Sequence, residues 1–256
     1  MRFVQTPNLP ESDAALVAVS GTYRIVIDAL RSFGIEILQI KPCDKLSSPV
    51  NSHADMILHH LGGNWVVAVN GESYLMEELQ QYGFEAVHSN VCISHVYPHD
   101  AVLNAARVGN RLFANKTALN AAVSRYCAQN RIEVIPVRQG YTKCSTVVVN
   151  NNSIITADQS IAAAAEAANV DVLKITPGYV KLDGYEYGFL GGACGLIGKN
   201  KLAFAGNVKT HPDYEKIKSF CCCKHVELIS LFGGELLDVG GILPLKVNAD
   251  SGKEKT

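Results

Sequence analysis

Two cysteines stand where a thiolate could act as a nucleophile. Cys144 follows the glycine-containing segment Gly140–Lys143 and precedes a run of three valines, and Cys194 lies among the glycines of Gly191–Gly195. A free thiol has a pKa of about 8.5, so a reactive Cys144 needs a nearby cation such as Lys143 to favour the thiolate. Because cysteine is also among the most often buried residue types, a core position is the alternative for both residues.

Histidines and acids supply the other candidates. His53 precedes Asp55 by two residues, a pair that suits either acid–base work or a turn that satisfies backbone groups. His95 and His99 are separated by Pro98, which excludes a regular helix with both rings on one face. The sequence also has no CxxC pair and no glycine-rich phosphate loop. We therefore expect no metal site and no cofactor.

The composition is that of a globular chain without strong charge. Of 256 residues, 48% are hydrophobic and 18% charged, and 23 Lys and Arg against 24 Asp and Glu give a net charge of −1. This balance offers no general attraction to a polyanion or to an anionic membrane, so neither is an expected partner. No apolar run approaches the roughly 20 residues of a membrane span, which favours a cytoplasmic protein with reduced cysteines.

A unit that recurs five times must position these residues. Its clearest part is a short strand whose second residue is acidic, and these acids are Glu36, Glu85, Glu133, Asp171 and Glu227. Their mean spacing of about 48 residues falls among the periods of solenoids and closed propellers. An amphipathic helical segment precedes each strand, and a hairpin with a Gly or Asn turn follows each of the first four. The first two predicted hairpins begin at Asp55 and Asp100, which hold the same place in their units.

The two ends of the chain are expected to complete the fifth hairpin. Val239–Leu245 has the pattern of its first strand, and only a polar segment follows it. We expect the second strand at the other terminus, in Arg2–Thr6, so that the termini pair and close a ring without exposed sheet edges. The sequence thus predicts one domain over residues 1–247 and a disordered tail over 248–256.

Five ββαβ units closed in this way resemble the pentein fold, the five-bladed α/β propeller of enzymes that modify guanidino groups. The chain is also similar to an uncharacterised bacterial branch of this superfamily in its His53–Asp55, Gly140–Cys144 and His211–Tyr214 segments. Penteins include arginine deiminases, dimethylarginine hydrolases and amidinotransferases, and also a ribosome anti-association factor without catalysis. The resemblance therefore implies the fold and leaves the function open.

The resemblance also implies an acid, a histidine and a cysteine in a set order around the ring. The enzymes carry their cysteine near the C-terminus, where this chain has Gly240 and Gly241 and no cysteine. A circular shift of the pattern by whole repeats keeps the order. Asp238 then becomes the acid, His53 the acid–base group and Cys144, 91 residues after His53, the nucleophile.

Substrate binding is expected to come from the remaining charged residues near these positions. A guanidinium is planar and cationic, so carboxylates hold it by paired hydrogen bonds, and the available acids are Asp55, Asp100 and Glu186. Lys143 and Arg107 would bind an anionic end of the substrate. For each of these residues a purely structural or surface ion pair is the alternative.

Two functions from different classes follow. The first is a cofactor-independent, cysteine-dependent hydrolase or transferase that acts on a small guanidino or amidino molecule through a covalent thioether. The second is a non-catalytic protein on the same scaffold that binds a small cationic metabolite or a macromolecular partner. The sequence leaves the substrate and the oligomeric state open.

Overall fold

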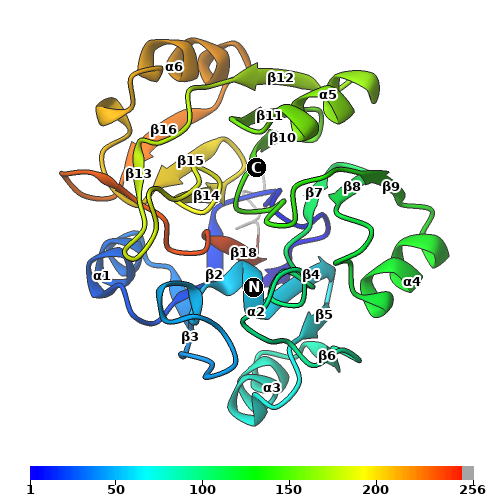
Figure 1. The fold of residues 1–256 in the computed structure, drawn as a ribbon. Helices are drawn as coiled ribbons and strands as arrows, with labels where there is room; N and C mark the ends of the chain where they lie inside the picture. The colour runs from blue at the N-terminus through cyan, green and yellow to red at the C-terminus, as the bar shows by residue number, and fades with distance from the viewer. Residues whose placement is uncertain (250–256) are drawn as a thin grey trace, which may run out of the picture.

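Five small sheets surround a common centre in the computed structural model, with the helices on the outside (Figure 1). The structure describes residues 1–249. In each sheet an antiparallel hairpin is followed by a helix and by a strand that pairs in parallel with the second hairpin strand. This is the order predicted from the repeat, and the five-bladed α/β propeller is confirmed.

The blades are numbered from the N-terminus. Blade one contains β18 (Leu243–Val247), β2 (Ala14–Ser20), α1 (Arg24–Ser32) and β3 (Glu36–Ile40). Blade two contains β4 (Leu58–Gly62), β5 (Trp65–Ala68), α3 (Ser73–Gln81) and β6 (Glu85–His88). Blade three contains β7 (Ala106–Val108), β8 (Arg111–Ala114), α4 (Ala121–Gln129) and β9 (Glu133–Pro136). Blade four contains β10 (Val147–Asn150), β11 (Ser153–Thr156), α5 (Gln159–Ala167) and β12 (Asp171–Lys174). Blade five contains β14 (Cys194–Gly198), β15 (Lys201–Phe204), α6 (Tyr214–Cys223) and β16 (Glu227–Ser230).

Smaller elements connect the blades. They are the helical turns η1 (Ser48–Val50), α2 (Ala54–Ile57) and η2 (Val208–Thr210), and the strand pair β13 (Val180–Lys181) and β17 (Leu236–Leu237). The turn α2 differs from the sequence-based expectation, because Asp55–Ile57 was assigned to a hairpin strand. One helical turn there buries Met56 and Ile57 and directs Asp55 towards the centre of the ring.

Local signals in the sequence start and end the helices. Asp158 accepts a hydrogen bond from the Ile161 N–H at 2.9 Å and caps α5, and Asn120 caps α4 through the Ala122 N–H at 2.8 Å. Gly34, directly after the last turn of α1, has a φ of +75°, a conformation that glycine adopts without steric cost. Each helix is therefore stopped just before the outer strand of its blade.

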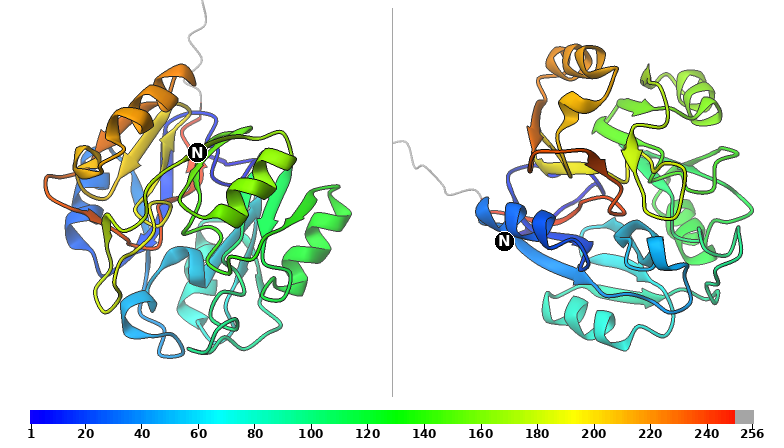
Figure 2. Two further views of the ribbon diagram at one scale, coloured as in Figure 1. Left: turned by 45° about the horizontal axis from the view of Figure 1, so that its top comes forward. Right: turned by 60° about the vertical axis from the view of Figure 1, so that its left-hand side comes forward.

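The ring closes between the two ends of the chain, as predicted. Strand β18 pairs in antiparallel fashion with β2 on one side and with β1 (Arg2–Phe3) on the other. The main partner is thus Ala14–Ser20, whereas the predicted Arg2–Thr6 supplies only a short extra strand. All seven residues of β2 are buried, so this strand lacks the alternation that marks a half-exposed strand. Figure 2 shows the blue and red ends of the chain side by side.

The two sides of the ring centre differ. On one side the N-terminal segment crosses the ring, where the Gly63 N–H donates to Val4 O and Asn8 Nδ2 donates to Arg107 O. On the other side lie the residues that precede the innermost strands β4, β7 and β10. The polar side chains singled out from the sequence gather on this second side.

Two further expectations concern the C-terminal tail and membrane-spanning helices. Residues 250–256 of the predicted tail lie outside the described residues, while the Asn248 N–H donates to Asp13 O at 2.9 Å and so continues the edge of blade one. Within residues 1–249, no helix combines the length and the apolar character that a membrane crossing requires.

Candidate active site

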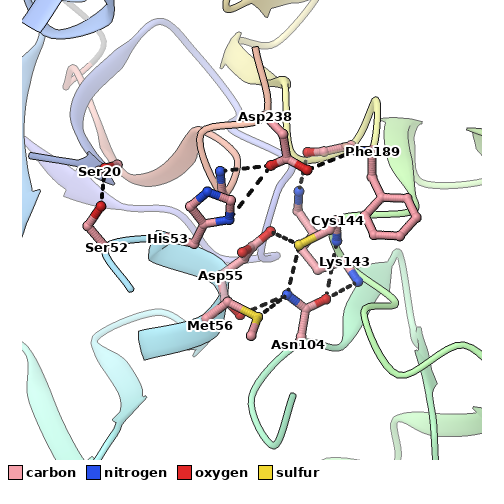
Figure 3. A network of polar contacts seen from close by, with 12 residues as sticks. Ser20, Ser52, His53, Asp55, Met56, Asn104, Lys143, Cys144, Phe189 and Asp238 are labelled. Atoms are coloured by element: carbon pink, nitrogen blue, oxygen red, sulfur yellow. Dashed lines mark hydrogen bonds and ion pairs between the residues drawn. The ribbon is translucent and has the colours of Figure 1, made fainter. Parts of the chain in front are cut away.

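A buried polar cluster forms where three blades bring the starts of their inner strands together (Figure 3). His53 and Asp55 come from α2 ahead of β4, Asn104 precedes β7, and Cys144 precedes β10. Asp238 reaches the same place from the connection between β17 and β18. Residues separated by as many as 185 positions in the chain thus share one site at the centre of the ring.

The Cys144 thiol has two polar partners. Its Sγ donates to Asp55 Oδ2 at 3.0 Å and accepts from Asn104 Nδ2 at 3.1 Å. Asn104 also fixes the backbone of the cysteine, because its Oδ1 accepts from the N–H groups of Lys143 at 2.7 Å and Cys144 at 3.2 Å. The amide therefore holds the segment before β10 in place, and the carboxylate faces the sulfur.

His53 and Asp238 form the opposite wall of the cluster. The His53 Nδ1 lies 3.7 Å from Asp238 Oδ1, longer than a hydrogen bond. The Asp238 carboxylate is anchored by backbone groups instead, since it accepts from the N–H of Phe189 at 2.8 Å and of Gly240 at 3.1 Å. Its charge favours the imidazole proton on Nδ1, which leaves Nε2 as an acceptor.

Lys143 is the buried cation of the cluster. Its Nζ donates to Gly191 O at 3.2 Å. Burial raises the pKa of Asp55, and the positive charge of Lys143 opposes that rise. The sequence-based expectation gave Lys143 the anionic end of a substrate. The structure places its ammonium group inside the protein, where it compensates part of the charge of the two carboxylates.

Burial shifts the cluster towards its uncharged forms. It raises the pKa of Asp55 from 3.8 to about 7 and, with the charges of Asp55 and Asp238, raises the pKa of Cys144 well above its usual value. Burial also lowers the pKa of His53, and the neighbouring Asp238 opposes this shift only in part. Near neutral pH the site by itself therefore holds a thiol and a neutral imidazole, not a preformed thiolate–imidazolium pair.

Glycines pack the backbone directly against these side chains. A Cβ at Gly192 would overlap Asp238 Oδ1, and a Cβ at Gly240 would overlap His53. Gly240 also has a φ of +75°, which other residues rarely adopt. The glycine-rich segments of the sequence thus let two stretches of backbone close over the carboxylate and the imidazole.

The cluster also contains a set of metal-binding atoms. Ligand atoms of His53, Asp55 and Cys144 all lie within 4.8 Å of one another. Imidazole, carboxylate and thiolate are the usual ligands of zinc, so these three residues could hold such an ion. The absence of a metal, expected from the sequence, stays a prediction.

Three predicted binding residues lie outside the cluster. Asp100 accepts from the Tyr141 hydroxyl at 2.5 Å, and this bond adds to burial in raising the pKa of Tyr141. Arg107 Nε donates to Gly109 O at 2.6 Å on the side of the ring centre that the N-terminal segment covers. Glu186 is exposed on the connection between β13 and β14. No hydrogen bond or ion pair within residues 1–249 joins these three side chains to Cys144, although Arg107 lines a small cavity together with Asp55 and Lys143.

Asn104 is the contributor that the sequence analysis missed. Asp100 was chosen there as the residue corresponding to Asp55, because each of these acids begins a predicted hairpin. In the structure Asn104, two residues before β7, occupies that place. A search for any hydrogen-bonding side chain just ahead of an inner strand, rather than for acids alone, could have found it.

Comparison with solved structures shows the same fold in enzymes of known type. The chain is 9% identical to the inosamine-phosphate amidinotransferase of Streptomyces griseus, with 97% of this chain and 98% of that chain covered and a TM-score of 0.57. It is 9% identical to the DDAH of Pseudomonas aeruginosa in complex with citrulline, with 85% and 92% covered and a TM-score of 0.55. For the agmatine deiminase of C. jejuni the identity is 10%, the coverage 89% and 90%, and the TM-score 0.51.

These similarities show the fold. All three structures are penteins, so the resemblance inferred from the repeat is confirmed. Comparison with curated proteins finds no match. The family of unknown function DUF6873 matches residues 18–243, which is most of the chain. The protein therefore belongs to the DUF6873 family and has the pentein fold.

Proposed function

We propose that the protein is a cysteine-dependent hydrolase or transferase that acts on a small guanidino or amidino molecule, with Cys144 as nucleophile. The proposal is supported by the structural neighbours, which are guanidino-modifying hydrolases and transferases. It is supported independently by the residues gathered around Cys144. Those residues include a carboxylate, an imidazole and a second carboxylate, the groups that such chemistry requires.

The observation that carries the proposal is a pair of unpartnered acceptors beside the thiol. Asp55 Oδ1 and His53 Nε2 are both buried and have no hydrogen-bond partner among the described residues. A buried acceptor without a donor costs about 1–3 kcal/mol. A guanidinium or amidinium presents several N–H donors in one plane and would satisfy both atoms at once.

The charge of the site favours a cation in the same place. Two buried carboxylates, Asp55 and Asp238, face one buried ammonium group, that of Lys143. A bound cation would lower the pKa of Cys144 and of Asp55, both of which burial raises. The substrate itself would thus help to generate the thiolate that attacks it.

The chemical steps can be assigned to named atoms. Asp55 Oδ2, 3.0 Å from the sulfur, takes the thiol proton, and the thiolate forms a C–S bond to the central carbon of the guanidinium. The bond from that carbon to one nitrogen then breaks, and the departing amine or ammonia takes up the proton released from the thiol. The product on the enzyme is a cationic amidino-thioether.

The second half of the reaction returns the cysteine. His53 Nε2 accepts a proton from water, the oxygen bonds to the same carbon, and the C–S bond breaks to give a urea group and the thiolate. If an amine replaces water, the product is a new guanidinium and the reaction is a transfer. In both cases Cys144 recovers its proton, and no oxidant or reductant is consumed.

Alkylation with 2-chloroacetamidine tests the proposal. The thiolate displaces chloride, so the adduct mass reports a C–S bond at a mapped cysteine, and neutral 2-chloroacetamide serves as the matched uncharged reagent. We expect Cys144 to react faster with the amidine than with the amide, by at least about tenfold, because only the amidine is a cation. Cys194→Ala should leave this rate unchanged, whereas Cys144→Ala should abolish it.

The opposite result would be labelling confined to the exposed cysteines Cys92, Cys222 and Cys223 with no preference for the amidine. It would mean that Cys144 is only a core residue, and the enzyme proposal would fail.

A non-catalytic binding protein is the second candidate, and one observation favours it. The raised pKa of Cys144 keeps the thiol protonated near neutral pH, as expected for a residue that only packs and donates. On this alternative a guanidino ligand would bind to Cys144→Ala as tightly as to the wild type. Titration calorimetry would give equal affinities and no continuing heat from turnover. Turnover lost in Cys144→Ala, with the protein still folded, would exclude it.

A further inference from the structure

A cavity lies beside the buried polar cluster around Cys144, which is called the cysteine cluster below. This cavity plays no part in the chemistry described above. Its volume is about 180 Å³, and it lies between blades four and five. The wall is formed by residues 175–179 after β12, by Val180 of β13, by the connection from Tyr187 to Leu190, and by Ser145 and His211. A cavity of about 150 Å³ holds a benzene molecule, so this one can hold a single ring with a short substituent.

The cavity contains a polar group without a partner. Ser145, which is 6% exposed, lines it, and its Oγ has no hydrogen-bond partner among the described residues. A buried hydroxyl normally has a partner, because leaving it unpaired is costly. A ligand that reaches the floor of the cavity would supply the missing hydrogen bond.

Aromatic side chains form the mouth and one wall. Tyr179 and Tyr187 are 50% and 38% exposed although both line the cavity, and Phe189 lies deeper. The Tyr179 ring packs edge-on against His211 with the centroids 5.6 Å apart. Exposed tyrosines around a concave site offer flat faces to a ring and to a cation.

The charge of the lining has one sign. Among the described residues that line the cavity, Asp158 is the only one with a formal charge at neutral pH apart from the titratable His211, and none of them is Lys or Arg. The Asp158 carboxylate accepts from Ser160 Oγ at 2.7 Å, from the Ile161 N–H at 2.9 Å and from Gln139 Nε2 at 3.3 Å, and it forms no ion pair within residues 1–249. The site therefore favours a positively charged ligand over an anion.

From these observations we infer that the cavity is a separate binding site for a small organic cation, namely an amine attached by a short chain to one ring. The ring lies against Tyr179, Tyr187 and Phe189, and the ammonium group donates to Ser145 Oγ and Asp158. The cavity and the cysteine cluster lie on opposite sides of one backbone strip. Phe189 lines the cavity, while its N–H donates to Asp238 at 2.8 Å.

Titration calorimetry of the full chain with phenethylamine tests this inference. Phenylacetate, which has the same ring and the opposite charge, is the matched reagent. We expect phenethylamine to bind at one site with a Kd of about 1 mM or tighter, and phenylacetate at least about tenfold more weakly. Asp158→Asn removes the charge and keeps an N-cap that is equally good for α5, so the protein should fold while phenethylamine binds about tenfold more weakly.

Two further variants separate this site from the cysteine cluster. Ser145→Ala should weaken phenethylamine binding about threefold to tenfold, as expected for one lost hydrogen bond. Cys144→Ala should leave the affinity unchanged, whatever becomes of the proposed enzyme activity. The inference is overturned if phenylacetate binds as well as phenethylamine, if neither reagent binds, or if binding is lost in Cys144→Ala and kept in Asp158→Asn.

Discussion

Two buried cysteines, Cys144 and Cys194, lie at or just before the inner strands of neighbouring blades, yet their surroundings differ. Cys144 stands three residues before β10 and has Asp55 Oδ2 and Asn104 Nδ2 as hydrogen-bond partners. Cys194 is the first residue of β14, pairs with Phe204 in the sheet and belongs to an apolar cluster. Burial raises the pKa of both thiols, to about 12 for Cys194.

The difference shows what makes a buried cysteine a candidate for chemistry. Exposure does not distinguish the two residues, since Cys144 and Cys194 are 3% and 2% exposed. What distinguishes them is the loop before the strand. The loop before β10 carries Cys144 to the ring centre, where polar side chains of two other blades meet it, whereas a residue inside the strand contacts its own sheet.

The largest effect is expected from removing the charge of Asp55. Asp55→Asn should slow alkylation of Cys144 by 2-chloroacetamidine by about 10²–10⁴-fold, because the group that takes the thiol proton and attracts the amidinium is lost. Mass spectrometry of the labelled peptide gives the rate. Asp183→Asn, an exposed acid on the connection after β13, is the control. Equal rates in wild type and Asp55→Asn would show that Asp55 does not activate Cys144.

The next effect concerns stability against pH. The pKa of Asp55 is about 7 in the folded protein and 3.8 ordinarily, so between these values the folded state binds the proton more tightly. The contribution of Asp55 to the free energy of unfolding is fully present below pH 4 and is lost as the pH rises through 7. Wild type should lose about 4 kcal/mol of unfolding free energy relative to Asp55→Asn between pH 4 and pH 8. Urea unfolding of both proteins at each pH measures it, and parallel curves would contradict the raised pKa.

A smaller effect is expected at Gly192, whose N–H donates to Cys144 O and which lies two residues before Cys194. A methyl group at position 192 would overlap Asp238, so Gly192→Ala should destabilise the protein by about 1–3 kcal/mol and slow the labelling of Cys144. At Gly233 a methyl group would meet open space and the φ is not positive, so Gly233→Ala should change neither quantity. Denaturant unfolding reports the stability, and similar values for the two variants would mean that the close packing on Asp238 is dispensable.

The smallest effect should come from Cys194 itself. Cys194→Ala removes one sulfur atom from an apolar cluster and should cost about 1 kcal/mol of stability. Cys144→Ala also leaves Asp55 Oδ2 without its sulfur partner, while Asn104 Nδ2 keeps Asp55 O as an acceptor at 3.2 Å, so it should cost about 1–3 kcal/mol. Urea unfolding at pH 7 compares them. A larger loss for Cys194→Ala would indicate that the polar partners of Cys144 contribute little to the folded state.

Much of the fold could be predicted because it repeats locally. The acid at the start of each outer strand, the helix before it and the glycine or asparagine turns after it are all short-range signals, and five copies reinforce one another. The main partner of β18 was missed because β2 is buried on both faces and shows no alternation. Arg2–Thr6, which lies at the other end of the chain from β18, was chosen in its place.

The sequence by itself determined the repeat, its closure into a ring, and which residue types stand near the starts of the inner strands. Only the tertiary structure decided which of these side chains meet. It brought His53, Asp55, Asn104, Cys144 and Asp238 together and gave Asp100 and Arg107 other hydrogen-bond partners, while Glu186 is exposed. The physical reason is that a contact across the ring depends on the direction in which each loop leaves its strand. A turn such as α2 or a glycine at position 240 changes that direction without changing the repeat.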